Sequence, residues 1–251
     1  MESHYVSQLL LRRFSKDNKV EVRNINMGTS KLKSPDEVAY INLSSDIFGD
    51  SEKKWANKYE GKLHEAYNLL ERGSLLENRK HTEFIKAFMA LLYVRSLSSY
   101  VLLGKKAHEK WNELRSELNF LNSVSETTSK NNFFDLVKTN TPSTLNTLIK
   151  KVKKEFGSYS LEIGESDSQS KFILSDVPVI TRHEDSSVGI LNGVGVHNSE
   201  FIFLPLSPKH IASLSATSQQ ISYVQLKSNA VASINQLSRK IAVKEIYVQP
   251  D

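Results

Sequence analysis

The sequence predicts an α+β fold: a mostly antiparallel sheet built from the C-terminal half of the chain plus N-terminal strands, with a large central helical block. Helical patterns dominate residues 51–156, whereas residues 157–251 hold mainly short β-rich runs separated by turn residues. Helical runs segregated from strand runs indicate α+β rather than a wound parallel sheet. We predict a single domain over residues 1–251, because strands from both ends of the chain are expected to join one sheet.

The N-terminal part is predicted to hold a helix and a strand before the helical middle begins. Residues 4–15 have the apolar spacing of a short helix, and KVEVRNI (19–25) alternates apolar and polar residues like a strand. Residues 51–72 form a predicted helix that a glycine ends. The stretch 81–121 is strongly helical, and Gly104 predicts a hinge that divides it into two helices.

The first half of that stretch is apolar on almost every side. The segment FIKAFMALLYV leaves nearly no polar face, and such a helix is usually buried. Residues 142–156 form the next predicted helix. The following strands are predicted at YSLEIG, KFILSD, VPVITR, GVGVH, EFIFLPL and HIASLSA. The helix SNAVASINQLSRK and the strand IAVKEIYV complete the chain.

Composition restricts the classes of function. The 251 residues include no cysteine, which excludes disulfides, thiolate zinc sites and cysteine nucleophiles and fits a reducing cytosol. The start lacks a signal-peptide cleavage site, and Lys86 and Arg95 interrupt the most apolar window, so we expect a soluble cytoplasmic protein with no membrane partner. The formal net charge of +5 attracts polyanions only weakly, which allows a nucleic-acid or nucleotide partner without establishing one.

Common nucleotide and hydrolase motifs are absent from the sequence. It contains no GxxxxGK[ST] phosphate loop, no GxGxxG after a strand and no GxSxG nucleophile elbow. Candidate functional residues therefore have to be found among polar side chains in unusual surroundings.

The first such group is at the N-terminus. On a helix, His4, Gln8 and Arg12 would share one polar stripe beside an otherwise apolar surface. The stripe is either the solvent-facing side of the helix or one wall of a site.

Arg95 is the second unusual residue, because it follows MALLYV in the most apolar helix of the chain. A buried guanidinium stays charged and needs a carboxylate, a phosphate or a set of carbonyl oxygens. Glu60 and Asp176 are the candidate partners within this sequence.

Asp176 is the third, at the end of the apolar run KFIL in KFILSDVPV. Pro178 biases the preceding residue towards an extended conformation, which leaves the carboxylate at a strand end. The alternative interpretation is a turn in which Asp176 caps backbone N–H groups.

These elements together resemble a mainly bacterial family that is classified as a domain of unknown function. HYVSQLLLRRFS is similar to the family's opening HYVPQFxLRxFS, and Ser175-Asp176-Val177-Pro178 is similar to its Ser/Thr-Asp-x-Pro. Glu60, Arg95 and the helical Asn235 match further family positions, as does the run FLPLSP. This chain departs from the family pattern at Ser7, where proline is usual, and after Arg95, where Ser-Leu follows. The resemblance implies a family without a chemistry, but it groups these polar residues, and we hypothesise that they converge into one pocket.

Our first functional hypothesis is a hydrolase of phosphodiester or nucleotide substrates, nuclease-like, in phage defence or as a toxin. His4 would carry the proton because its free pKa is near neutrality, with Asp176 and Glu60 as the catalytic carboxylates. No metal site is assigned, although a divalent cation on Asp176 and Glu60 is compatible with hard oxygen ligands.

The substrate-binding residues of that hypothesis are polar or cationic. Arg12 and Arg95 would stabilise phosphoryl charge, and Gln8 and Asn235 would position the substrate. The alternative hypothesis is a non-catalytic protein that binds a small anion or a partner, in which the same residues form a structural buried polar network. The sequence leaves enzymatic activity, metal dependence and oligomeric state open.

Overall fold

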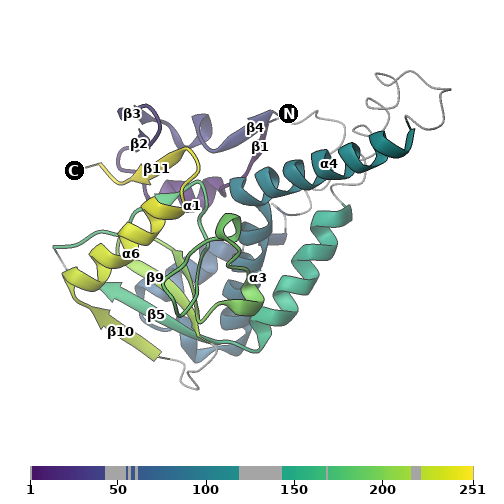
Figure 1. Cartoon of the computed structure of the whole chain (residues 1–251). Helices are drawn as coiled ribbons and strands as arrows, with labels where there is room; N and C mark the ends of the chain where they lie inside the picture. Colours follow the sequence, from purple (N-terminus) through teal and green to yellow (C-terminus); the bar gives the residue numbers. More distant parts are fainter. Residues whose placement is uncertain are drawn as a thin grey trace.

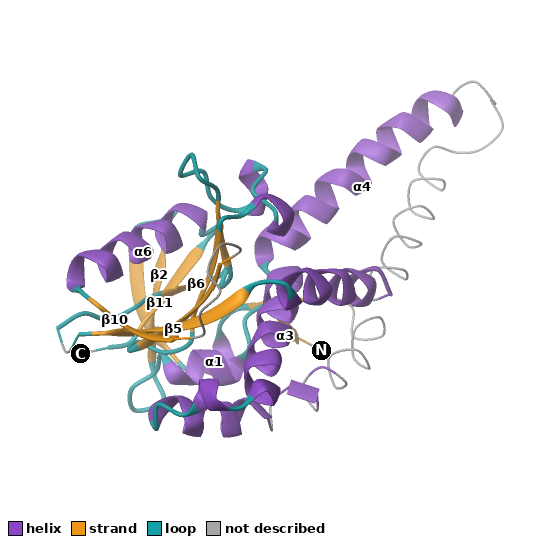
Figure 2. Ribbon diagram, turned by 90° about the horizontal axis from the view of Figure 1, so that it is seen from below, coloured by secondary structure: helices purple, strands orange, loops and turns teal. Residues whose placement is uncertain are grey.

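The structure is a computed structural model that describes residues 2–42, 55, 58–59, 62–118, 143–167, 169–215 and 222–250. Its helices and mostly antiparallel sheets confirm the predicted α+β fold (Figure 1). Helix α6 (Ser228–Ile241) lies on one side of the strands, and α1 (Gln8–Arg13) and α3 (Arg79–Arg95) lie on the other (Figure 2). None of the described helices combines the length and apolar character that a membrane crossing requires.

The larger sheet has five strands from the C-terminal half of the chain, in the order β10-β5-β9-β8-β7. Their bounds are β5 (Ser160–Ser166), β7 (Ile180–Arg182), β8 (Phe201–Pro205), β9 (His210–Ser215) and β10 (Ser222–Leu226). β10 pairs parallel with β5, and the other three pairs are antiparallel. On β5 and β8 buried residues alternate with half-buried ones, so one face of the sheet belongs to the core and the other is partly open.

The second sheet joins the two ends of the chain, in the order β3-β2-β11-β6. It consists of β2 (Val20–Asn24), β3 (Thr29–Lys33), β6 (Leu174–Ser175) and β11 (Glu245–Val248), and all pairs are antiparallel. The expected meeting of N-terminal and C-terminal strands is confirmed by the β2–β11 pair. In the described part of the chain these strands form a sheet separate from the five-stranded one.

The predicted N-terminal helix begins later than expected. His4 lies in a short strand, β1 (Glu2–His4), which pairs antiparallel with β4 (Tyr40–Asn42), and α1 begins at Gln8. The Tyr5 N–H also donates to the Ala39 carbonyl oxygen at 2.9 Å. Long-range backbone pairing therefore outweighs the local helical pattern at His4 and Tyr5.

The helix break predicted at Gly104 is also misplaced. α3 ends at Arg95 and α4 (Leu97–Leu118) begins two residues later, so Gly104 lies inside a helix. At the break the Ser96 and Ser99 hydroxyls each donate to the Tyr93 carbonyl oxygen at 2.9 Å. These bonds satisfy a carbonyl that the interrupted helix leaves without its usual partner. Beyond the break, α4 extends away from the rest of the described chain (Figures 1 and 2).

The remaining helical segments are short or lie near their predicted positions. Residues 62–71 and 143–157 are helical, within and next to the predicted ranges. The segment GVGVH, predicted as a strand, forms no strand and instead leads into a 3-10 turn. The 3-10 turns are η1 (Pro35–Glu37), η2 (Leu75–Glu77), η3 (Ile190–Asn192) and η4 (Val196–Asn198).

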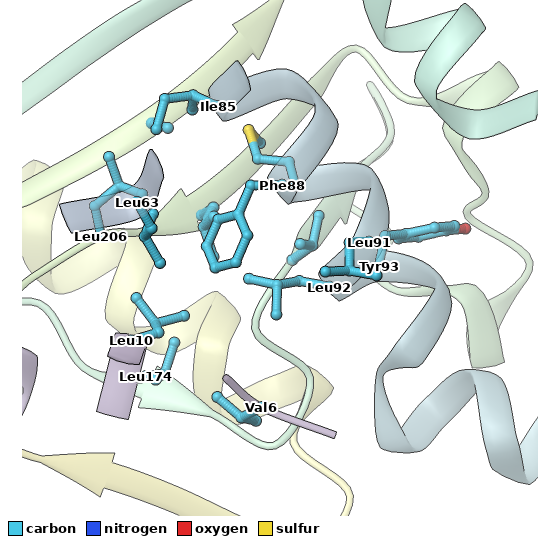
Figure 3. Packing of buried hydrophobic residues seen from close by; sticks show 14 of the residues in the cluster. Val6, Leu10, Leu63, Ile85, Phe88, Leu91, Leu92, Tyr93, Leu174 and Leu206 are labelled. Atoms are coloured by element: carbon cyan, nitrogen blue, oxygen red, sulfur yellow. The ribbon is translucent and has the colours of Figure 1, made fainter. Parts of the chain in front are cut away.

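The core lies between α3, α1 and the strands. As its apolar sequence predicts, α3 is buried at every residue from 85 to 95. Phe88 and Leu92 of α3 gather with Leu10 of α1 and Leu174 of β6 (Figure 3). Burying one such side chain contributes about 1.5–3 kcal/mol. The N-terminal helix, the middle helix and a strand of the C-terminal half thus share one apolar cluster.

Candidate functional site

Asp176 follows β6 and binds the backbone at the start of β11. Its Oδ1 accepts from Val243 N–H at 2.9 Å, and its Oδ2 accepts from Lys244 N–H at 2.6 Å and Glu245 N–H at 2.9 Å. The residue is 0% exposed. Its carboxylate therefore fastens one segment of the chain to another, as in the N–H-capping interpretation, although the capped groups lie 67–69 residues away.

The local Ser-Asp-x-Pro conformation places Asp176 in this position. The Ser175 hydroxyl donates to the Val177 carbonyl oxygen at 2.8 Å and accepts from Val177 N–H at 3.3 Å. Burial raises the pKa of the Asp176 carboxyl to about 6, although the three N–H donors act in the opposite direction.

A chain of polar side chains continues from this point towards the N-terminus. The Tyr247 hydroxyl donates to Glu245 Oε2 at 3.0 Å, and it lies 3.4 Å from the Tyr5 hydroxyl. Burial raises the pKa of both tyrosines above its usual value. Tyr5, the neighbour of His4 in sequence, thus extends the Asp176 group, and both tyrosines stay protonated at neutral pH.

Asn235 makes a second connection between distant segments. From α6 its Oδ1 accepts from Ile173 N–H at 3.0 Å, and its Nδ2 donates to the Lys171 carbonyl oxygen at 2.8 Å. The side chain therefore pairs with the backbone just before β6, as a neighbouring strand would.

His4 and Gln8 meet at the predicted N-terminal position. Gln8 Nε2 lies 3.1 Å from His4 Nε2, and both side chains are half-buried. The Gln8 amide and the His4 ring thus form one hydrogen-bonded pair.

Arg95 reaches the same place from the end of α3. Its guanidinium donates to the His4 carbonyl oxygen and lies over the Trp55 ring, with Cζ 4.8 Å from the ring centroid. The buried Arg95 guanidinium thus has a carbonyl oxygen as a partner, which is one of the three kinds of partner expected for a buried arginine. Arg12, by contrast, pairs with Asp36 at 3.2 Å on the surface, where both side chains are about half exposed.

The predicted site residues therefore fall into groups. His4, Gln8 and Arg95 meet, whereas Asp176 and Asn235 bind backbone groups around β6. Glu60, and with it the predicted Glu60–Arg95 pair, lies outside the described residues. Catalytic roles for these side chains remain predictions. Within the described residues no cluster of three or more His, Asp or Glu side chains is arranged to hold a metal ion.

A second candidate site is a hollow of about 200 Å³ on the partly open face of the five-stranded sheet, bordered by Ile234 of α6. Phe203, Ser213 and Glu162 form one cross-strand row of its lining. Phe201 and Arg182 face each other across the next strand pair.

Arg182 is the cation of this hollow. Its Cζ lies 5.8 Å from the centre of the Phe201 ring, and the side chain is half-buried. Within the described parts of the chain Arg182 makes no salt bridge and no side-chain hydrogen bond, so its charge is available to a ligand.

Several of these residues were missed from the sequence, although some signals were present. Glu245 and Tyr247 are two apart in a strand, which places both on one face, and a buried tyrosine there implies a buried carboxylate. The alternation in EFIFLPL likewise places Phe201 and Phe203 side by side. Nothing local indicates that Arg182 borders the same surface, because that depends on the β7–β8 pairing.

Comparison with known proteins gives a family. No curated protein and no solved structure matches the chain. The model of one family, described as "Protein of unknown function (DUF4238)", matches residues 3–251, which is almost the whole length. The chain therefore belongs to the DUF4238 family of proteins of unknown function.

Proposed function

We propose that this chain is a non-catalytic protein that binds a small anion in the hollow beside Arg182. The observation that carries the proposal is a half-buried guanidinium with no ion pair among the described residues, at the edge of a largely apolar hollow. A guanidinium offers a planar fork of N–H donors to carboxylate or phosphate, and an apolar surrounding strengthens such bonds.

The geometry of Asp176 and Asn235 supports a structural role for the sequence-predicted polar residues. The Asp176 carboxylate accepts three backbone N–H groups and is 0% exposed, so it does not face solvent from which a metal ion or substrate would arrive. Both Asn235 functional groups are likewise taken up by backbone partners. In this proposal the two residues hold β6, β11 and α6 together.

The test is calorimetric titration of the full chain with inorganic phosphate. We expect Arg182→Gln to weaken binding by about tenfold or more, which corresponds to about 1.4 kcal/mol or more. The matched control is Arg79→Gln, which removes the same charge from an exposed position at the start of α3. Equal affinity in wild type and Arg182→Gln, or no binding by wild type, contradicts the proposal.

The second candidate is the hydrolase, nuclease-like and acting on phosphodiesters or nucleotides. The observation that favours it is the His4 imidazole, which is half-buried rather than enclosed and is oriented by Gln8 while Arg95 holds its backbone. An oriented histidine in partial contact with solvent is a suitable proton carrier.

This candidate is tested by incubating wild type and His4→Ala with DNA, RNA and nucleotides, with and without Mg²⁺ or Mn²⁺. Turnover by wild type that His4→Ala loses, with an unchanged melting temperature, supports the hydrolase against the binding proposal. Absence of turnover across the panel removes the hydrolase.

A further inference from the structure

We infer that the anion bound beside Arg182 is a short apolar monocarboxylate of about four to six carbon atoms. This inference rests on the proposed anion binding and adds a ligand class to it. The ligand places its carboxylate on the Arg182 guanidinium and its hydrocarbon tail in the rest of the hollow.

The Arg182 side chain supplies the charged end of the site. Its Cζ lies over the Phe201 ring, and the residue pairs with Phe201 across β7 and β8. Among the described residues no oxygen accepts a hydrogen bond from its guanidinium N–H groups. A guanidinium and a carboxylate form two parallel hydrogen bonds, so one arginine is sufficient to hold one carboxylate.

The charge of the lining favours a carboxylate over a phosphate. Arg182 is the single cation among the described lining residues. A phosphate monoester carries a charge of roughly −1.5 to −2 at pH 7, whereas a carboxylate carries one negative charge. One guanidinium therefore leaves part of a phosphate charge without a partner, and such charge is unfavourable beside apolar side chains.

The rest of the lining is mainly apolar and suits a hydrocarbon tail. Its aliphatic side chains are Ile211 of β9, Val224 and Leu226 of β10 and Ile234 of α6. A bare inorganic anion leaves this surface in contact with water, whereas a hydrocarbon tail covers it. Because burial of one methylene group strengthens binding by up to about fourfold, the lining favours an anion that carries a tail.

The size of the hollow limits the length of that tail. Its volume is about 200 Å³, which at ~30 Å³ per water molecule of the liquid is room for roughly seven non-hydrogen atoms. A Cβ added to Gly164 would be 2.6 Å from Leu226 Cδ1 and 2.8 Å from Ile211 Cγ2. These two side chains therefore lie against the Gly164 backbone and close the hollow on that side. Pentanoate has the size that this space allows.

The lining also distinguishes a monocarboxylate from a dicarboxylate. A second carboxylate at the end of the tail would lie among aliphatic side chains, with no second cation among the described lining residues. Glu162, the other charged residue of the lining, already has an interaction within the protein, and binding requires nothing of it. We therefore expect glutarate to bind more weakly than pentanoate.

The experiment is calorimetric titration of the full chain with pentanoate, acetate, octanoate, pentanamide, glutarate and inorganic phosphate. We expect pentanoate to bind about tenfold or more tightly than acetate, pentanamide, glutarate or phosphate. Octanoate should bind no more tightly than pentanoate, because its additional methylene groups lie outside the hollow.

Two kinds of variant separate the charge from the tail. Arg182→Gln should reduce the affinity for pentanoate to that for pentanamide. Ser213→Leu fills the hollow from the half-buried middle of β9, and should reduce the affinity for pentanoate to that for acetate while the affinity for phosphate stays unchanged. Val224→Phe, from an exposed position on β10, fills the same hollow if Ser213→Leu does not fold. Arg79→Gln should leave all affinities unchanged, and melting temperatures establish that each variant is folded.

The contrary outcomes separate this inference from the anion-binding proposal. Phosphate or acetate that binds as tightly as pentanoate overturns the apolar ligand and leaves the anion-binding proposal intact. Octanoate that gains a further fourfold per methylene group, or filling variants that bind pentanoate normally, overturn the hollow as the place of the tail. Glutarate that equals pentanoate overturns the monocarboxylate class. Failure of phosphate and of every acid to bind overturns both.

Discussion

The replacement Asp176→Ala distinguishes a structural carboxylate from a catalytic one. It removes the acceptor of the N–H groups of Val243, Lys244 and Glu245, in a place where Asp176 is 0% exposed. A buried donor without a partner costs about 1–3 kcal/mol, so three such donors cost roughly 3–9 kcal/mol.

Part of that cost is offset because the variant no longer buries a carboxylate. Burial raises the pKa of Asp176 from 3.8 to about 6, a shift of about two units. At about 1.36 kcal/mol per unit, this relieves about 3 kcal/mol at pH 7. We therefore expect a net loss of roughly 3 kcal/mol in the free energy of unfolding, or a fall of about 6–12 °C in melting temperature for a chain of this size.

The assay is urea denaturation at pH 7, followed by circular dichroism and tryptophan fluorescence. The control is Asp185→Ala, which removes an aspartate that accepts from Ser187 N–H at 2.8 Å in an exposed turn. We expect this control to change stability by less than about 0.5–1 kcal/mol. If Asp176→Ala is as stable as Asp185→Ala, the structural role is refuted. Normal stability with loss of a measured turnover would instead indicate catalysis.

Three further predictions concern the pH dependence of the Asp176 contribution, the Asn235 connection and the apolar core. The pKa of Asp176 is higher in the folded chain than in the unfolded chain, so protonation of this carboxyl stabilises the fold. This contribution to the free energy of unfolding is complete below pH 3.8 and is lost as pH rises through about 6. The stability difference between wild type and Asp176→Ala should thus widen by up to ~3 kcal/mol when urea titrations move from pH 7 to pH 4, and a narrower gap at pH 4 would reverse the assigned sign. Asn235→Ala removes the acceptor of the buried Ile173 N–H and should cost about 1–3 kcal/mol in the free energy of unfolding by urea denaturation. Replacement of its exposed neighbour, Gln236→Ala, should be near neutral, and equal values for the two variants would contradict the connection through α6. Phe88→Ala opens a cavity at a side chain that is 1% exposed and should cost about 3–5 kcal/mol by the same measurement, against little change in Met27→Ala, which is 74% exposed. A small loss of stability in Phe88→Ala would mean that α3 is not the centre of the core.

Some of these features could be predicted from the local sequence pattern alone. The apolar surface of FIKAFMALLYV predicted a buried helix, and α3 is buried at every residue from 85 to 95. The position of Arg95 in this apolar helix also predicted that its guanidinium needs a partner. The His4 carbonyl oxygen is one of the expected kinds of partner. Segregated helix and strand runs predicted the α+β class, because hydrophobic period and turn residues are local properties.

Other features depended on residues that are distant in sequence. His4 was predicted in a helix, but it pairs as a strand with Tyr40 because that pairing is available only in the folded chain. The break in the central helix was predicted at Gly104, whereas buried serine hydroxyls make it possible at Ser96. The hydrogen bonds of Tyr247 to Tyr5 and Glu245 likewise join residues from the two ends of the chain, which no local pattern indicates.

By itself, therefore, the sequence determined the fold class, the buried helix and which polar residues need an explanation. It even indicated that Asp176 could bind backbone N–H groups. Only the tertiary structure decided which groups these are, because β6 meets β11 across some seventy residues of chain. The same holds for the hollow beside Arg182, whose walls come from five strands and a helix that a local pattern cannot bring together.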